Sequence, residues 1–222
     1  MDSSPKKSVF NPTTPPRQTR RGRGWLIAAI TLIIIGGGLV IYPFLPGIRY
    51  ALFKPTPELP YRTQLSNSEG GQAALAGLPS LPVIGNKRIP QENRLVIPSI
   101  GVDMPILEGP TEKVLDRGGI WHLPDTSGPD RGGNTVLSGH RWQYLPPSST
   151  TLYLLDKVNV GEPAIIYWQG QEYDYRISGR DVIDPDQVEI LNNTTEPRLT
   201  IFTCTPLFST KQRLVIYGEL IS

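Results

Sequence analysis

Apolar residues follow two different patterns along the chain. Between Trp25 and Leu45 nearly every residue is apolar and none is charged. From about residue 93 onward, short apolar runs alternate with turns rich in glycine, proline, asparagine and aspartate. The long stretch predicts a membrane-spanning helix, and the short runs predict a domain built of β-strands.

The apolar stretch predicts an uncleaved transmembrane signal-anchor helix over residues 25–45. A helix rises 1.5 Å per residue, so this length matches a hydrocarbon core of roughly 30 Å. Trp25 and Tyr42 lie near its ends, where aromatic side chains favour the membrane interface. A cleaved signal peptide is the alternative, but Ala74-Leu75-Ala76, which resembles a cleavage site, lies too far downstream.

Residues 1–24 predict a disordered cytoplasmic tail, because they hold almost no apolar side chains. The basic residues of this tail are Lys6, Lys7, Arg17, Arg20, Arg21 and Arg23, against the single acid Asp2. Positive charge before a span favours an N-terminus in the cytoplasm, which places everything after the span outside. The net charge of the chain is +2, so the remainder has an excess of acidic residues. We therefore expect no nucleic-acid partner.

Residues 46–92 predict an extended, proline-rich and glycine-rich extracellular linker that holds a domain away from the membrane. Residues 93–222 predict that domain. Strands are expected over 94–98, 102–107, 163–168, 172–178 and the three runs discussed next, and short helical turns over 111–116, 151–158 and 186–191. Gln169-Gly170 is expected to form a hairpin turn. Many short strands with no long helix predict an all-β, closed or nearly closed β-barrel.

Three strands carry side chains suited to covalent chemistry at their ends. Cys204, the only cysteine, ends the run 199–204 and precedes Pro206; His140 ends the run from Asn134; and Arg213 opens the run that follows. A thiolate can attack a carbonyl, an imidazole can exchange the proton, and a guanidinium can face the developing negative charge. Most free cysteines are small buried apolar residues, and the local sequence alone leaves that alternative open.

These strands resemble those of the sortases, the cysteine transpeptidases of Gram-positive-type cell surfaces. The sortase signature is Thr-Leu-x-Thr-Cys, and here residues 199–204 carry Ile201-Phe202 in the variable middle, followed by Thr205-Pro206. The Gly-His strand and the Arg-Leu-Val strand occur in the family's order. The resemblance implies an eight-stranded barrel in which the loop between the sixth and seventh strands walls a substrate groove.

The resemblance also implies residue roles. Cys204 would be the nucleophile, His140 the proton-exchanging group and Arg213 the cation facing the substrate. His122 competes with His140 from the residues alone, but in the family its position is not the catalytic one, so a locally hydrogen-bonded histidine is preferred. The candidates for substrate contact are Thr203, Ser138, Gly139 and His122. The cations Arg141 and Lys211 are expected to be surface residues.

The expected activity is cleavage of an LPXTG-like sorting signal between Thr and Gly, followed by transfer to an amine of a cell-wall precursor or a pilin lysine. The Thr-Cys-Thr-Pro ending, with no second apolar span after Ile221, points away from pilin-polymerising enzymes that carry a C-terminal anchor. The resemblance is to class D- or E-like sortases, and it leaves the class open. No cofactor is expected, and Asp184, Asp186 and Glu189 are too few to predict a metal site. The alternatives are a catalytically silent surface β-barrel that binds cell-wall peptides, and an L,D-type transpeptidase, whose Ser-x-Gly-Cys motif is not matched.

Overall fold

The structure, a computed structural model, describes residues 21–53, 90–143 and 149–221. The chain divides into two compact units, one ending at Ile41 and one beginning at Tyr42. Residues 1–20 of the predicted tail and residues 54–89 of the predicted linker lie outside the described residues.

The first unit holds helix α1 (Arg21–Ile41). Its apolar side chains are exposed, and it is long and apolar enough to cross a membrane. The structure ends this helix four residues before the predicted boundary at Leu45. A 3-10 turn, η1 (Tyr42–Phe44), follows, because Pro43 and Pro46 both lack the N–H that a continuous helix needs.

Helix α2 (Leu45–Leu52) follows η1 in the second unit. The sequence predicted an extended segment from residue 46, and over residues 46–52 the structure differs from that prediction. Pro46 lies in the first turn of α2, where a missing N–H costs no helical hydrogen bond, so proline there starts a helix.

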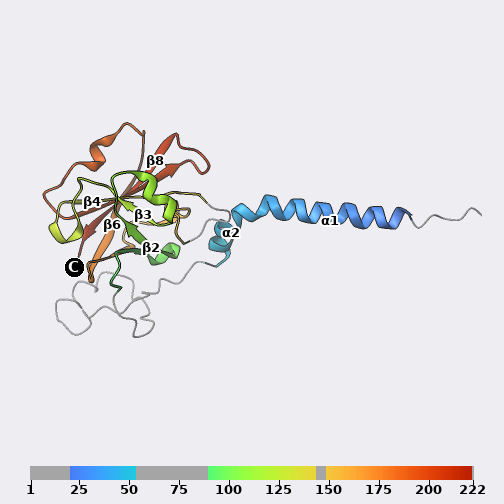
Figure 1. Cartoon of the computed structure of the whole chain (residues 1–222), viewed down its shortest axis with the longest axis horizontal. Helices are drawn as coiled ribbons and strands as arrows, with labels where there is room; N and C mark the ends of the chain where they lie inside the picture. Colours follow the sequence, from blue (N-terminus) through green and yellow to red (C-terminus); the bar gives the residue numbers. More distant parts are fainter. Residues whose placement is uncertain (1–20, 54–89, 144–148, 222) are drawn as a thin grey trace, which may run out of the picture. The chain divides into compact units, whose positions relative to one another are not determined.

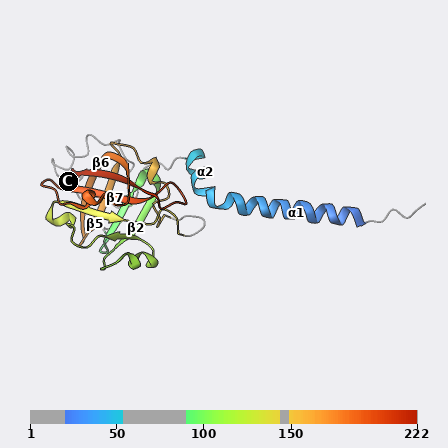
Figure 2. The same cartoon turned by 90° about the horizontal axis from the view of Figure 1, so that it is seen from above.

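Eight strands of the second unit form a closed barrel (Figures 1 and 2). They are β1 (Arg94–Ile97), β2 (Val102–Leu107), β3 (Ile120–His122), β4 (Asn134–Ser138), β5 (Pro163–Trp168), β6 (Gln171–Ile183), β7 (Arg198–Thr205) and β8 (Gln212–Leu220). Around the barrel the order is β1-β2-β3-β4-β7-β8-β6-β5, and β5 pairs with β1 to close it. The β2–β3 and β4–β7 pairs are parallel and the others antiparallel. The predicted all-β barrel is therefore confirmed.

Short 3-10 helices occupy several connections between the strands. They are η3 (Pro98–Ile100), η4 (Glu112–Arg117), η5 (Pro129–Arg131), η6 (Leu155–Lys157) and η7 (Val188–Leu191). The helical turn predicted over 151–158 is thus reduced to η6. Leu152, Leu155 and Val158 are spaced by three residues, which matches the three-residue turn of a 3-10 helix.

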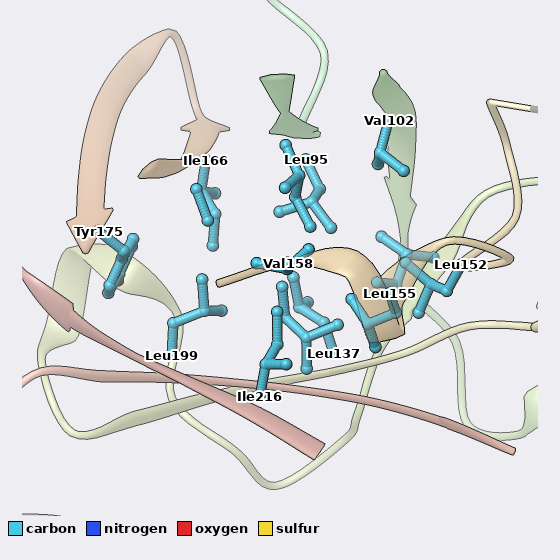
Figure 3. Packing of buried hydrophobic residues seen from close by; sticks show 14 of the residues in the cluster. Leu95, Val102, Leu137, Leu152, Leu155, Val158, Ile166, Tyr175, Leu199 and Ile216 are labelled. Carbon is cyan, nitrogen blue, oxygen red and sulfur yellow. The ribbon is translucent and has the colours of Figure 1, made fainter. Parts of the chain in front are cut away.

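Aliphatic side chains from opposite walls of the barrel meet in its interior. Figure 3 shows Leu95 and Ile166 pointing toward Leu199 and Ile216 across the core. Leu155, from η6, joins the same cluster and is fully buried. The inward residues of β7 and β8 therefore alternate with outward ones, and this alternation decides which side chains can reach a substrate.

A buried polar network fixes the ends of β4 and β7 that lie away from Cys204. The Asn134 side chain donates to the carbonyl oxygens of Ile190 (2.8 Å) and Asn192 (3.0 Å). Its own oxygen accepts a hydrogen bond from the Thr200 hydroxyl (2.7 Å). These bonds tie the connection between β6 and β7 to both strands.

Candidate active site

Parallel pairing of β4 with β7 brings His140 and Cys204 to the same end of the barrel. Ser138 lies opposite Phe202 in the register, and the Gly139 N–H donates to the Phe202 carbonyl (3.3 Å). His140 and Cys204 each lie two residues beyond that pair. Because parallel strands run in the same direction, both side chains emerge at one rim.

Cys204 and Arg213 lie directly opposite each other on the antiparallel strands β7 and β8. Ile201 on β7 and Leu214 and Ile216 on β8 point into the core, so the alternation turns Cys204 and Arg213 outward together. Opposed residues on one face have Cβ atoms about 4.5–5.5 Å apart. Cys204 is half-buried and is not in a disulfide. A reachable sulfur therefore stands beside a fixed cation.

Carbonyl oxygens of its own loop hold the Arg213 side chain. Its Nη1 donates to the carbonyls of Thr210 (2.9 Å) and Gln212 (3.2 Å). Ile183, the last residue of β6, pairs with Arg213, so the connection from β6 to β7 starts beside this arginine. Among the described residues both protein contacts use Nη1, which leaves the Nε and Nη2 hydrogens for a bound group.

The turn that carries His140 is held against β7 from both sides. The Thr203 hydroxyl, in a residue only 1% exposed, donates to the Gly139 carbonyl (2.7 Å). The Leu152 N–H donates to the His140 carbonyl (2.8 Å). A Cβ on Gly139 would come within 3.1 Å of the Leu152 side chain, so glycine permits this close packing. Thr203 and Gly139, predicted as substrate contacts, are buried in the structure and link the two strands.

Arg141 joins three segments of the site, and its prediction as a surface residue is wrong. The side chain is 6% exposed. Its Nη1 donates to the Thr205 hydroxyl (2.9 Å) and lies 3.5 Å from the Cys204 carbonyl, and its Nη2 donates to Asp156 (2.8 Å). A carboxylate and two oxygens at a strand end compensate the cost of burying this charge. Arg141 therefore links the residue after His140 to the end of the Cys204 strand.

Aromatic side chains connect the segment after β4 with the loop between β7 and β8. Trp142 packs edge-on against Phe208, with ring centroids 5.8 Å apart. Phe208 lies in the loop from β7 to β8, between Cys204 and Arg213. Tyr153 is buried, and this burial raises the pKa of its hydroxyl. To smaller extents, Arg141 lowers that pKa and Asp156 raises it. The contact could not be predicted from the sequence, because Trp142 and Phe208 lie 66 residues apart in the chain and only the fold brings them together.

His122 lies apart from these residues. Its ring is 8% exposed, stacks edge-on with Trp168 at 5.1 Å, and has Nε2 3.1 Å from the Ser127 carbonyl. Its Nδ1 lies 3.3 Å from Glu108. His122 pairs with Leu137, three residues before His140. The contacts of its ring match the preferred alternative of a locally hydrogen-bonded histidine.

Ser138 remains open to a bound group, since it is half-buried on the outer face beside Phe202. The acidic residues Asp184, Asp186 and Glu189 lie in the connection between β6 and β7 and are exposed. Within the described residues, no group of three or more histidine, cysteine or acidic side chains is arranged to hold a metal ion.

Comparison with known proteins gives one family. Residues 95–221 match the family model of the sortase domain. The chain is 26% identical to sortase A of Bacillus anthracis over 90% of this chain and 95% of that protein, and 30% identical to sortase SrtE1 of Streptomyces coelicolor over 57% and 39%. Among solved structures, sortase C1 of Streptococcus agalactiae is 35% identical with a TM-score of 0.53, over 59% of this chain and 69% of that one. Sortase E1 of Streptomyces coelicolor, solved with a tripeptide in its active site, is 27% identical with a TM-score of 0.53, over 60% and 88%.

Proposed function

Because this chain belongs to the sortase family, we propose that it cleaves an LPXTG-like sorting signal between Thr and Gly and joins the new carboxyl end to an amine. Sortases are cysteine transpeptidases that anchor surface proteins. The observation that carries the proposal is the meeting of Cys204, His140 and Arg213 at one rim of the barrel. The tripeptide in the sortase E1 relative supports a peptide substrate.

In the first step, the Cys204 thiolate attacks the carbonyl carbon of the signal threonine. A carbon–sulfur bond forms, and the carbonyl oxygen becomes an oxyanion. Arg213 lies directly opposite Cys204, so its remaining N–H groups can donate to that oxygen. A guanidinium suits this role because it stays charged and presents its donors in one plane.

In the second step, the carbon–nitrogen bond to glycine breaks. His140 gives its proton to the departing amine, which leaves a thioester on Cys204. The acceptor amine then attacks the thioester carbon, His140 takes a proton from it, and the thiolate leaves. The proposed acceptor is an amine of a cell-wall precursor or a pilin lysine. We propose that Ser138, on the outer face beside Phe202, contacts the peptide during these steps.

We further propose that the catalytic barrel lies outside the cell. Helix α1 is apolar enough to cross a membrane, and the basic residues of the chain's first 24 positions lie before its apolar part, which starts at Gly24. Positive charge stays on the cytoplasmic side of a span. The thiol of Cys204 would then meet sorting signals on the outer surface.

One experiment tests the activity and the orientation together. Protoplasts that carry the full chain are incubated with a membrane-impermeant library of labelled peptides, with and without an added amine. We expect a covalent label on Cys204 without the amine, and release of a peptide–amine product when it is added. We also expect the label to form before the membrane is permeabilised.

The possible outcomes separate the alternatives. Peptide binding with no covalent label, before and after permeabilisation, would indicate the catalytically silent barrel and overturn the proposed function. Covalent labelling that requires permeabilisation would keep the activity and overturn the orientation.

Arg141 is expected to support the reaction without contacting the substrate. In Arg141→Met, the end of β7 loses its charged donor to Thr205 and Asp156 loses its buried partner. Hydrogen bonds to charged groups are worth about 1.5–3 kcal/mol, so we expect about a 10- to 100-fold slower acylation of Cys204. Single-turnover acylation with a labelled peptide measures this rate.

Lys157→Met is the matched control for Arg141→Met. Lys157 pairs with the same carboxylate, Asp156, at 2.9 Å, but its side chain is exposed. Exposed pairs contribute about 0–1 kcal/mol, so this variant should acylate nearly as fast as the unaltered protein. Equal acylation rates in the two variants, measured well below their melting temperatures, would show that Arg141 does not position Cys204.

A further inference from the structure

One face of helix α2 is apolar and exposed. Leu45, Ile48 and Leu52 follow one another at intervals of three and four residues, which places them on one side of a helix. Ile48 is 42% exposed and Leu52 is 71% exposed, and Phe53, the next residue, is exposed as well. Large apolar side chains gathered on one exposed face usually mark an interaction surface.

The opposite side of α2 is packed against the barrel, so the helix cannot turn its apolar face inward. Tyr50 packs on the hydrophobic core of the barrel. Gly47 lies against the Tyr153 ring, and the Tyr153 hydroxyl donates to the Pro43 carbonyl (3.4 Å) just before the helix. Leu45, Ile48 and Leu52 therefore face away from the protein.

The length of the apolar stretch indicates what the exposed face of α2 contacts. The apolar helical stretch runs from Gly24 to Leu52, which is 29 residues. A span needs roughly 17–25 predominantly apolar residues. The part of α1 that starts at Gly24, after Arg21 and Arg23, already supplies 18 of them, up to Ile41. Helix α2 is therefore additional to the span and follows it after η1. Tyr42 and Arg49 are of the residue types that favour the level of lipid headgroups.

We propose that the face of α2 formed by Leu45, Ile48 and Leu52, together with Phe53, binds the surface of the lipid bilayer. Short amphipathic helices bind there with their apolar side among the headgroups and the first acyl carbons. The occupant is lipid rather than a second copy of the chain, because α2 begins only four residues after the end of α1.

This surface adjoins the candidate active site. Phe44, directly before α2, packs edge-on against Phe208 with ring centroids 6.0 Å apart. Phe208 lies in the loop between Cys204 and Arg213 and also contacts Trp142. Docking of α2 on the bilayer would hold this rim of the barrel near the membrane surface. That the rim is the active site rests on the proposed function.

The test uses the full chain in liposomes, with an environment-sensitive NBD fluorophore on a single introduced cysteine. Ile48→Cys and Leu52→Cys are made in a Cys204→Ala background, so lipid contact is read without any activity. Glu196→Cys is the control, since Glu196 is exposed and precedes β7 at the end away from Cys204. Thermal unfolding verifies that each labelled chain is folded.

We expect a blue-shifted emission at positions 48 and 52 and about twofold or stronger quenching by lipids that carry a nitroxide near the headgroup. The label at position 196 should emit as in water and remain unquenched. A blue shift without nitroxide quenching, rising with the protein-to-lipid ratio, would indicate a second copy and overturn the proposal. Emission at 48 and 52 equal to that at 196 would overturn it as well. Neither result depends on peptide cleavage.

Discussion

Replacement of Cys204 with alanine is expected to abolish formation of the acyl-enzyme. The sequence contains no second cysteine, and a methyl group cannot attack a carbonyl. Because Cys204 is half-buried on the outer face of β7, the change should leave the barrel intact. The measurement is the mass of the protein after incubation with a labelled sorting peptide, with thermal unfolding as the check on folding. A peptide adduct of unchanged mass and yield on the alanine variant would place the nucleophile elsewhere.

The two histidines provide the internal control for this prediction. General acid–base catalysis contributes about 10²–10⁴-fold, so His140→Ala should lower the acylation rate by that order. His122→Gln keeps a hydrogen-bonding side chain beside the Ser127 carbonyl and should retain most of the rate. Equal losses in the two variants, at equal melting temperature, would show that His140 has no special role.

The second large effect is expected for Arg213→Lys. Lysine keeps the positive charge but loses the planar arrangement of donors, of which Nη1 is held by the Thr210 and Gln212 carbonyls. Removal of an oxyanion donor costs about 10²–10³ in rate, or roughly 3–4 kcal/mol, and we expect a loss of this size in single-turnover acylation. Peptide binding by the Cys204→Ala protein should change much less when Arg213→Lys is added, because the oxyanion exists only during the reaction.

Arg180→Lys is the matched control for Arg213→Lys. Arg180 is exposed, and its Nη1 donates to a backbone carbonyl, that of Asp156, at 2.8 Å. Its replacement by lysine tests the general cost of losing a guanidinium on the barrel surface. If the two lysine variants acylate at the same rate, Arg213 contributes only a general positive field.

The strands that carry the site could be predicted because strong local signals bound them. Pro206 lies two residues after Cys204, a glycine precedes His140, and the Gln169-Gly170 turn fixes the β5–β6 hairpin. The parallel pairing of β4 with β7 was not visible, because its partners lie far apart in the chain and parallel pairs leave no turn signal. The family resemblance implied that His140 acts together with Cys204, and the structure supplies the strand pairing.

Arg141 and helix α2 show why other features were missed. Hydropathy marks an arginine as a surface residue, and only the fold brings Asp156 and Thr205 within reach of its guanidinium. The prolines after residue 45 predicted an extended segment instead of helix α2. Tyr50 stabilises this helix through its contact with the barrel. Both errors have one cause: tertiary contacts outweigh local preference.

The position of β8 in the barrel affects how the protein folds. This strand lies between β7 and β6 in the barrel, yet it follows both in the chain. Until it pairs, β7 and β6 each expose an unpaired edge, and such edges promote aggregation of incomplete chains. The same strand delivers Arg213 to Cys204. Barrel closure and completion of the candidate active-site rim are thus one folding event. A chain whose β8 has not yet paired carries a thiol that lacks its neighbouring cation.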